Sequence, residues 1–252
     1  FSATMFPMLY YRELLTTDRD AYGIYVQSPF PKENRRILIG SDVSSRYTRR
    51  NRAEYRKIAG YIARCVWQRQ GNYMVFFPSY RLMEDVLQVY EEEFSVDWVR
   101  CVCQTPDMTE QEREGFLEEF QEREGTLVGF CVLGGIFSEG VDLTGESLIG
   151  AVIVGTGLPQ IGSQREILKE YYDKKNHCGF DYAYRYPGMN KVLQAAGRVI
   201  RTKEDKGVIL LLDDRFWDRD YQEIFPREWQ DRTGCRLDTV EGAVETFWKR
   251  FT

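Results

Sequence analysis

The segment 194–201, QAAGRVIR, combines side chains that suit a polyphosphate. At a rotation of about 100° per residue on a helix, Gln194, Arg198 and Arg201 share a narrow polar sector, and the remaining side chains are apolar. A buried guanidinium group needs an anionic partner. A carboxylate of the same chain would meet that need, but two guanidinium groups side by side match phosphate oxygens better. We therefore expect an anion-binding helix face here.

A second candidate site follows the apolar segment 127–133. Two glycines come first, and the segment FSEGVDL then places Ser138, Glu139, Gly140 and Asp142 within five residues. Glycine allows a backbone to approach a ligand closely, and the polar side chains supply hydrogen-bonding groups. The composition favours a functional loop over a purely structural one.

A third candidate is the segment 73–80, YMVFFPSY, in which an apolar run ends at Pro78. Ser79 is placed to cap a following helix, and free N–H groups at a helix start bind phosphate well. Tyr80 could stack on a nucleic-acid base or pack on the rim of the site. A simple helix cap explains the same residues, so this pattern is weak by itself.

Apolar runs alternate with helical patterns along the chain. Strands are expected at 22–27, 36–41, 73–77, 99–103, 127–133, 148–154 and 207–212. Helices are expected at 49–70, 80–94, 109–121, 163–175, 189–201 and 239–250. Strands separated by helices predict an α/β fold with a mostly parallel sheet and helices on both faces. Ligands of such sheets bind beyond the carboxyl ends of the strands.

Composition indicates an ordinary globular protein, with 252 residues, 43% hydrophobic residues and a net charge of −5. No apolar run reaches the roughly 18 residues of a membrane span, and the first residues have no basic secretion signal. One local basic stretch could bind nucleic acid or form a solvated helix start: Arg46, Arg49, Arg50, Arg52, Arg56 and Lys57. The six cysteines fit no zinc pattern and His177 is the single histidine, so we expect reduced thiols, no metal site and a cytoplasmic location.

In this order, the three segments resemble the motifs of superfamily-2 DNA helicases of the DinG and XPD type. YMVFFPSY is similar to motif IV, FSEGVDL to motif V and QAAGRVIR to motif VI, and Ser2-Ala3-Thr4 is similar to the element that couples the two motor domains. The resemblance extends from about residue 1 to about residue 229. It implies a RecA-like fold for residues 21–252, with residues 1–20 linking from a first motor domain.

That first domain carries the Walker A loop in the family, and no G-x-x-x-x-G-K-[ST] segment occurs in this chain. The resemblance therefore implies that ATP and magnesium are held mainly by the absent domain, where an iron–sulfur cluster is also possible. One segment, VILLLDD at 208–214, has the form of a Walker B strand. Without a Walker A loop it cannot complete a magnesium–nucleotide site, and a core strand is the better interpretation.

The resemblance also implies roles for individual residues. Arg198 and Arg201 would be arginine fingers, with Gln194 near the phosphates or the attacking water. Asp142, with Glu139 and Gly140, would bind near the nucleotide. Single-stranded DNA would lie against a track of Ser79, Tyr80, Ser138, Thr4 and Arg49. Two alternatives stay open: a degenerate RecA-like module that binds nucleic acid or protein without motor activity, and a stand-alone nucleotide enzyme, which the missing Walker A loop disfavours.

Overall fold

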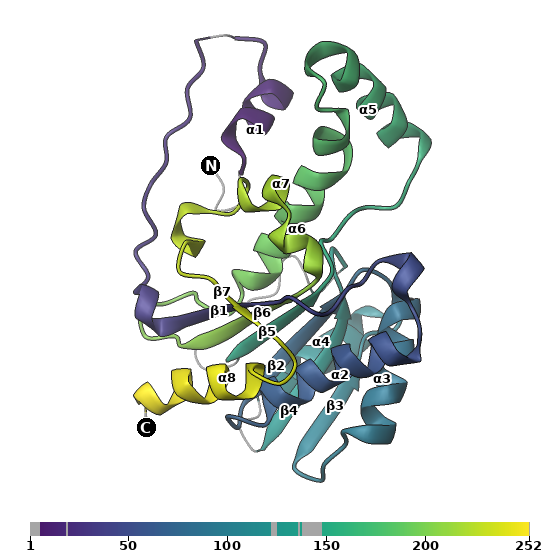
Figure 1. Ribbon diagram of the computed structural model, residues 1–252, viewed down its shortest axis with the longest axis vertical. Helices are drawn as coiled ribbons and strands as arrows, with labels where there is room; N and C mark the ends of the chain where they lie inside the picture. Colours follow the sequence, from purple (N-terminus) through teal and green to yellow (C-terminus); the bar gives the residue numbers. More distant parts are fainter. Residues whose placement is uncertain (1–5, 19, 122–124, 136, 138–147, 252) are drawn as a thin grey trace.

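The computed structural model describes residues 6–18, 20–121, 125–135, 137 and 148–251. These residues form one seven-stranded sheet in the order β3-β4-β2-β5-β6-β1-β7, and all neighbouring strands are parallel (Figure 1). The strands are β1 (Arg35–Gly40), β2 (Asn72–Phe77), β3 (Val99–Cys103), β4 (Thr126–Val132), β5 (Gly150–Val154), β6 (Gly207–Leu212) and β7 (Thr233–Cys235).

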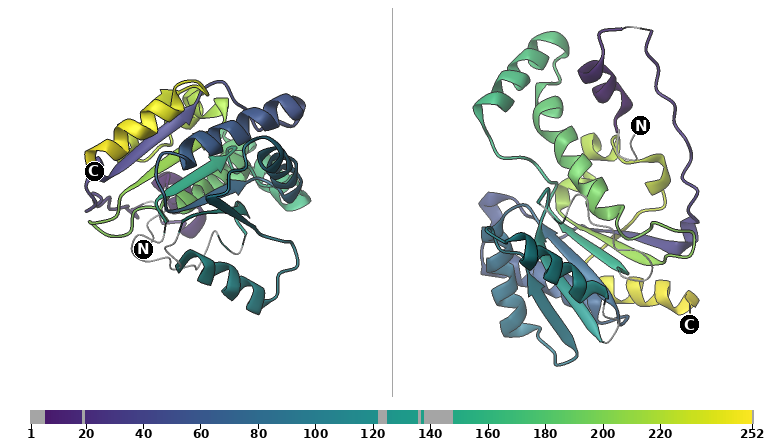
Figure 2. Two further views of the ribbon diagram at one scale, coloured as in Figure 1. Left: turned by 90° about the horizontal axis from the view of Figure 1, so that it is seen from below. Right: turned by 180° about the vertical axis from the view of Figure 1, so that it is seen from behind.

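Helices cover both faces of this sheet (Figure 2). They are α1 (Met8–Leu15), α2 (Arg52–Val66), α3 (Tyr80–Glu93), α4 (Glu110–Glu118), α5 (Ser163–Asn176), α6 (Tyr186–Ala196), α7 (Arg219–Gln222) and α8 (Val240–Trp248). Alternate strand residues divide between two cores. Val75 and Phe77 face α2, α3 and α8, whereas Met74 and Phe76 face α4 and α6. The expected α/β fold with helices on both faces is confirmed.

The expected strand at residues 22–27 is wrong. This segment has no regular structure, and Tyr22, Ile24 and Val26 are largely exposed. Alternating apolar residues form a strand only where a neighbouring strand supplies hydrogen bonds and a core receives the side chains. Here Tyr25 instead donates a hydrogen bond to Oε1 of Glu228 at 2.5 Å, and the segment crosses the surface as an extended strap.

The helix expected at 189–201 is also shorter than the pattern suggested. Helix α6 ends at Ala196, and Gly197 follows as its C-cap. The backbone N–H groups of Arg201 and Thr202 donate to the Asp205 carboxylate at 2.8 and 2.7 Å. Because this side chain takes donors that a longer helix would use internally, the chain turns after Gly197, and Arg198 and Arg201 are not on one helix face.

Helix α1 packs away from the main sheet, against α5 and the start of α6 (Figure 1). The Tyr10 ring meets Tyr182 and Tyr186 edge-on, with centroids 5.3 Å away in both cases. The Asn190 amide of α6 also donates to the Tyr11 hydroxyl at 2.8 Å. The segment expected to link from another domain is thus fastened to the helices beside the sheet. Among the described residues, no helix has the length and apolarity needed to cross a bilayer.

Candidate functional site

Loops from three strands meet at the carboxyl edge of the sheet. Gly155 follows β5 with φ of +85°, a conformation that disfavours L side chains. A Cβ at this position would lie 2.5 Å from Oγ of Ser45, which follows β1, and 3.7 Å from Pro78, which follows β2. A glycine here therefore lets the loop after β1 lie next to the β2 end.

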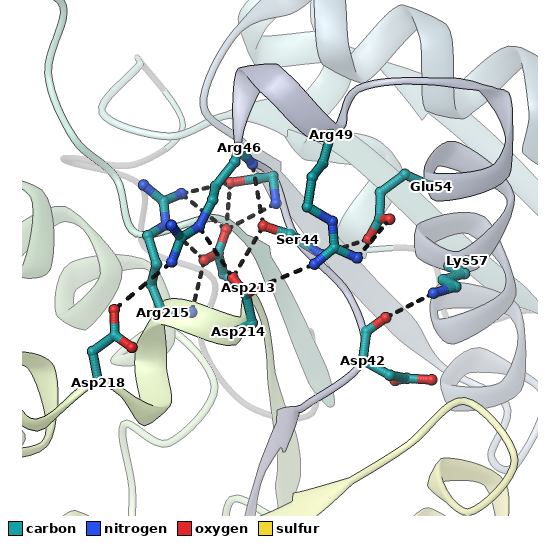
Figure 3. A network of polar contacts seen from close by, with 11 residues as sticks. Asp42, Ser44, Arg46, Arg49, Glu54, Lys57, Asp213, Asp214, Arg215 and Asp218 are labelled. Atoms are coloured by element: carbon teal, nitrogen blue, oxygen red, sulfur yellow. Dashed lines mark hydrogen bonds and ion pairs between the residues drawn. The ribbon is translucent and has the colours of Figure 1, made fainter.

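A buried ion pair anchors the loop after β1 to the end of β6 (Figure 3). The Asp213 side chain is fully buried, and Arg215 donates to it from Nε at 2.7 Å and from Nη2 at 2.9 Å. Ser45 donates to the same carboxylate from its backbone N–H at 2.9 Å and its hydroxyl at 2.6 Å. Arg215 also donates to the Ser45 hydroxyl at 3.0 Å, which closes the network.

Burial acts to raise the pKa of Asp213, but the hydrogen bonds and charge of Arg215 together with the Ser45 donors outweigh it, so the pKa of this carboxyl lies below its ordinary value. The same pairing, against the effect of burial, raises the pKa of Arg215. Both groups are consequently charged at neutral pH. The Arg215 backbone N–H also donates to Asp213 at 3.0 Å, so this buried carboxylate accepts from five donors, stabilises the loop and has no capacity left for a ligand.

A second layer of charges lies outside this pair (Figure 3). Asp214 accepts from the Ser44 hydroxyl at 3.0 Å and from Arg49 at 3.2 Å. Glu54 accepts from the Ser44 backbone N–H at 2.6 Å and from Arg49 at 3.0 Å. The Arg49 guanidinium, expected to contact nucleic acid, is therefore held between two carboxylates of its own chain.

The geometry does not support a Walker B strand at VILLLDD. It agrees with the core-strand interpretation favoured in the sequence analysis. Segment 208–212 is the buried β6 core strand, and both following aspartates bind arginine and serine donors. Within the described ranges, no group of three or more His, Cys, Asp or Glu side chains is placed to hold a metal ion.

Tyr80 and Ser79 lie at the same carboxyl edge. The Ser79 hydroxyl caps α3 by accepting from the Leu82 N–H at 3.4 Å. The Tyr80 hydroxyl accepts from Nε2 of Gln104 at 2.9 Å, while Oε1 of Gln104 accepts from the Val132 N–H at 2.9 Å. Gln104 therefore fixes the tyrosine ring relative to the ends of β3 and β4, a role that the sequence pattern did not indicate.

The backbone that carries the motif VI arginines turns beside the start of β6. Val199 packs against Gly207, the first residue of β6, and the Arg201 backbone is bound by Asp205. Arg198 is only 5% exposed, and its charge acts on the Cys131 thiol of β4, whose pKa is raised chiefly by burial. Gln194 is half-buried on α6. Burial first, and then the nearby Cys131 thiol, raise the pKa of Tyr80, so the Arg198 side chain and Tyr80 both lie within electrostatic range of Cys131 in the carboxyl half of β4.

Five predicted site residues lie outside the described residues, so their predictions stand as sequence-based ones. These are Thr4, Ser138, Glu139, Gly140 and Asp142. The sequence did not indicate roles for Ser45, Arg215 and Gln104, and it offered Asp213 only as part of the Walker-B-like segment. The aspartate and arginine were visible as a D-D-R segment after a strand, but nothing in the sequence linked them to a serine 168 residues away.

Known proteins share this architecture. A family model described as helicase C-terminal domain matches residues 62–232. A probable ATP-dependent helicase of Methanocaldococcus jannaschii is 29% identical over 206 residues, which cover 77% of this chain and 31% of that protein. The ATP-dependent DNA helicase XPD of Sulfolobus acidocaldarius is 28% identical over 229 residues, covering 85% of this chain and 38% of the relative. The chain thus spans about a third of the length of these relatives.

Solved structures agree on the fold. An XPD helicase structure superposes with a TM-score of 0.63 and 24% identity, covering 80% of this chain and 35% of the other. The structure of S. tokodaii Xpd4 gives a TM-score of 0.60 and 16% identity, covering 87% of this chain and 42% of the other. These superpositions and the parallel sheet confirm the RecA-like α/β architecture.

The buried pair predicts the largest stability effect at the carboxyl edge. Arg215→Ala should lower the free energy of unfolding by about 3–5 kcal/mol at pH 7, because it leaves a buried carboxylate without its cation. Urea denaturation would measure this loss. Arg219→Ala is the matched control: Arg219 is exposed and pairs with exposed Glu223, so its loss should stay within about 1 kcal/mol.

The effect of Arg215→Ala should also depend on pH. Since folding lowers the pKa of Asp213, the stabilisation is present above the unfolded pKa of about 3.9 and is lost as the pH falls through the folded value. The difference between wild type and Arg215→Ala should therefore shrink below about pH 4. An equal difference at pH 3 and pH 7 would contradict the ion-pair assignment.

Proposed function

The chain belongs to the helicase C-terminal domain family, and from this membership we propose that it is the second motor domain of an ATP-dependent DNA helicase. In this proposal it supplies arginine fingers to ATP bound on a first RecA-like domain, and it forms part of the track for single-stranded DNA. The matched relatives named as ATP-dependent helicases are longer than this chain, which is consistent with a division of the motor between two domains.

The observation that carries the proposal is the position of Q-A-A-G-R-V-I-R at the end of α6. The backbone of this segment leaves α6 after Ala196 and turns beside the start of β6, where Val199 lies against Gly207. Two arginines on one short turn next to a glutamine on the preceding helix support the assignment to a polyphosphate, because each guanidinium fork matches phosphate oxygens.

In the proposed reaction, charge spreads over the γ-phosphoryl oxygens of ATP in the transition state, and arginine fingers offset it. Such fingers accelerate hydrolysis roughly 10³–10⁵-fold. Arg201, half-buried, contacts the phosphates directly, whereas Arg198, at 5% exposure, must change its side-chain conformation when the two domains close. Gln194 lies one turn before Arg198 and orders the attacking water or the phosphates.

Magnesium and most of the nucleotide contacts are assigned to the first domain, since the described carboxylates at the carboxyl edge are already occupied by arginine and serine. Glu139, Gly140 and Asp142 complete the nucleotide side. Closure around ATP and reopening after hydrolysis then follow as a hinge motion between the two domains. The track uses Ser79 and Tyr80, with Ser138 and Thr4, through contacts that carry little sequence preference. Arg49 joins it through the 40% of its side chain that stays exposed beside Asp214 and Glu54.

Substitution of the fingers tests this proposal. In the protein that contains both motor domains, Arg198→Ala or Arg201→Ala should reduce DNA-stimulated ATP hydrolysis about 10³-fold, because the transition-state charge loses its partner. Single-strand binding should persist. A steady-state phosphate-release assay measures the first effect and fluorescence anisotropy the second. Arg219→Ala, on the exposed face of α7, is the control, and normal turnover in both finger variants would rule out the assignment.

The division of labour gives a second test. The 252-residue chain alone should hydrolyse no ATP above background, because the arginine fingers act on a nucleotide held elsewhere and the sequence contains no Walker A loop. The measurement is phosphate release by the purified chain with and without single-stranded DNA. If ATPase activity co-purifies with the wild-type chain and is absent from the Arg201→Ala variant, this domain binds ATP by itself.

A further inference from the structure

The basic stretch after β1 is mostly engaged within the chain. Arg49 is bound by Asp214 and Glu54. Arg52 and Arg56 pair with Glu92 and Glu93 of α3, and Lys57 donates to the Asp42 carbonyl. These contacts fasten the stretch to neighbouring elements, and we call the four residues involved the structural clamp: Arg49, Arg52, Arg56 and Lys57. Two residues of the same stretch are not part of it.

Tyr47 and Arg50 are these two residues. Tyr47 lies on a 3-10 turn (Tyr47–Arg49) and is 84% exposed. The Arg50 guanidinium lies over its ring, 5.6 Å from the centroid, and its Nε donates to the Ser45 carbonyl at 3.3 Å. Within the described part of the chain, no carboxylate forms an ion pair with Arg50. An exposed aromatic ring beside an unneutralised guanidinium is the combination that binds unstacked bases and their phosphates.

The turn that carries Tyr47 is rigid. Before the turn, Ser45 donates to Asp213, and Ser44 donates to Asp214 and Glu54. At the end of the turn, Arg49 donates to Asp214 and Glu54 as well. The ring is thus presented to solvent from a fully hydrogen-bonded base. A preorganised platform loses little conformational freedom when a ligand binds it.

The turn also adjoins the candidate track. A Cβ at Gly155 would lie near both Ser45 and Pro78, so Ser45, two residues before Tyr47, lies close to the residue that precedes Ser79. The charges of Arg50 and Arg81 both act on the hydroxyl of Tyr55, which places Arg50 close to the first turn of α3. A strand lying over Ser79 would therefore pass within reach of Tyr47.

We propose that Tyr47 is a stacking platform for a base of single-stranded nucleic acid and that Arg50 binds the adjacent phosphate. This assignment rests on the proposed function, since it extends the track from Ser79 toward β1. It also explains why Arg50 is spared from the clamp that engages Arg49, Arg52 and Arg56. Stacking on one ring accepts any base, so the platform suits movement along a strand without sequence preference.

The test measures binding of fluorescein-labelled oligo-dT and oligo-U by the 252-residue chain, using anisotropy across a range of salt concentrations. Tyr47→Ala should raise Kd about tenfold, and Tyr47→Phe should leave it within about twofold because the ring is retained. Arg50→Ala should weaken binding and lower the slope of log K against log salt by about one, whereas Arg50→Lys should restore the slope. Comparing the two oligonucleotides distinguishes DNA from RNA as the occupant.

The matched control is Tyr22→Ala, because Tyr22 is 85% exposed and belongs to the 22–27 strap. The segment between α1 and β1 runs along the side of the molecule opposite α2 and α3 (Figure 1). Oligonucleotides that contain 5-iodouracil should photo-crosslink to Tyr47, as mapped by mass spectrometry. If binding survives Tyr47→Ala and the crosslinks fall on Tyr80 instead, the platform is overturned and the track of the proposed function stands. If the wild-type chain binds neither oligonucleotide, both the platform and the track are overturned.

Discussion

A single buried carboxylate organises the carboxyl edge of this domain. Asp213 is fully buried at the end of β6, and its charge is tolerated only because Arg215 and both donors of Ser45 surround it. The interaction joins two segments separated by 168 residues. Asp214 and Glu54 hold the neighbouring Ser44, so the buried carboxylate is the inner of two layers that fix the loop after β1 beside the end of β2.

Two kinds of functional side chain lie on different elements around the sheet. Aromatic and hydroxyl groups gather where the strands end, and the motif VI arginines follow α6 where β6 begins. Helix α6 spans the distance between them, since Gly188 in its first turn packs against Gly157 after β5, while Val199 beyond its end packs against Gly207. Helix α6 thus runs along the sheet from the ends of the strands to the start of β6.

Much of this was predictable from the sequence, because continuous apolar runs are typical of buried parallel strands. β2, β4, β5 and β6 were each identified in this way. The strand predicted at 22–27 is wrong because periodicity describes side chains and cannot tell whether a neighbouring strand is present. The predicted end of the helix at residue 201 is wrong because the Asp205 carboxylate, which binds the backbone after α6, lies beyond the helix. The Ser45–Asp213 contact is purely tertiary, and no local pattern encodes it.

Helix α1 is tied to α6 through the Tyr10 contacts and the Asn190–Tyr11 hydrogen bond, and α6 leads directly into the turn that bears Arg198. The first helix therefore rests on the same helix that ends at the arginine turn. A shift of α1 relative to the sheet would have to break the Asn190–Tyr11 hydrogen bond or be accommodated by α6, so the placement of the chain before Tyr10 and that of the arginines share one supporting element.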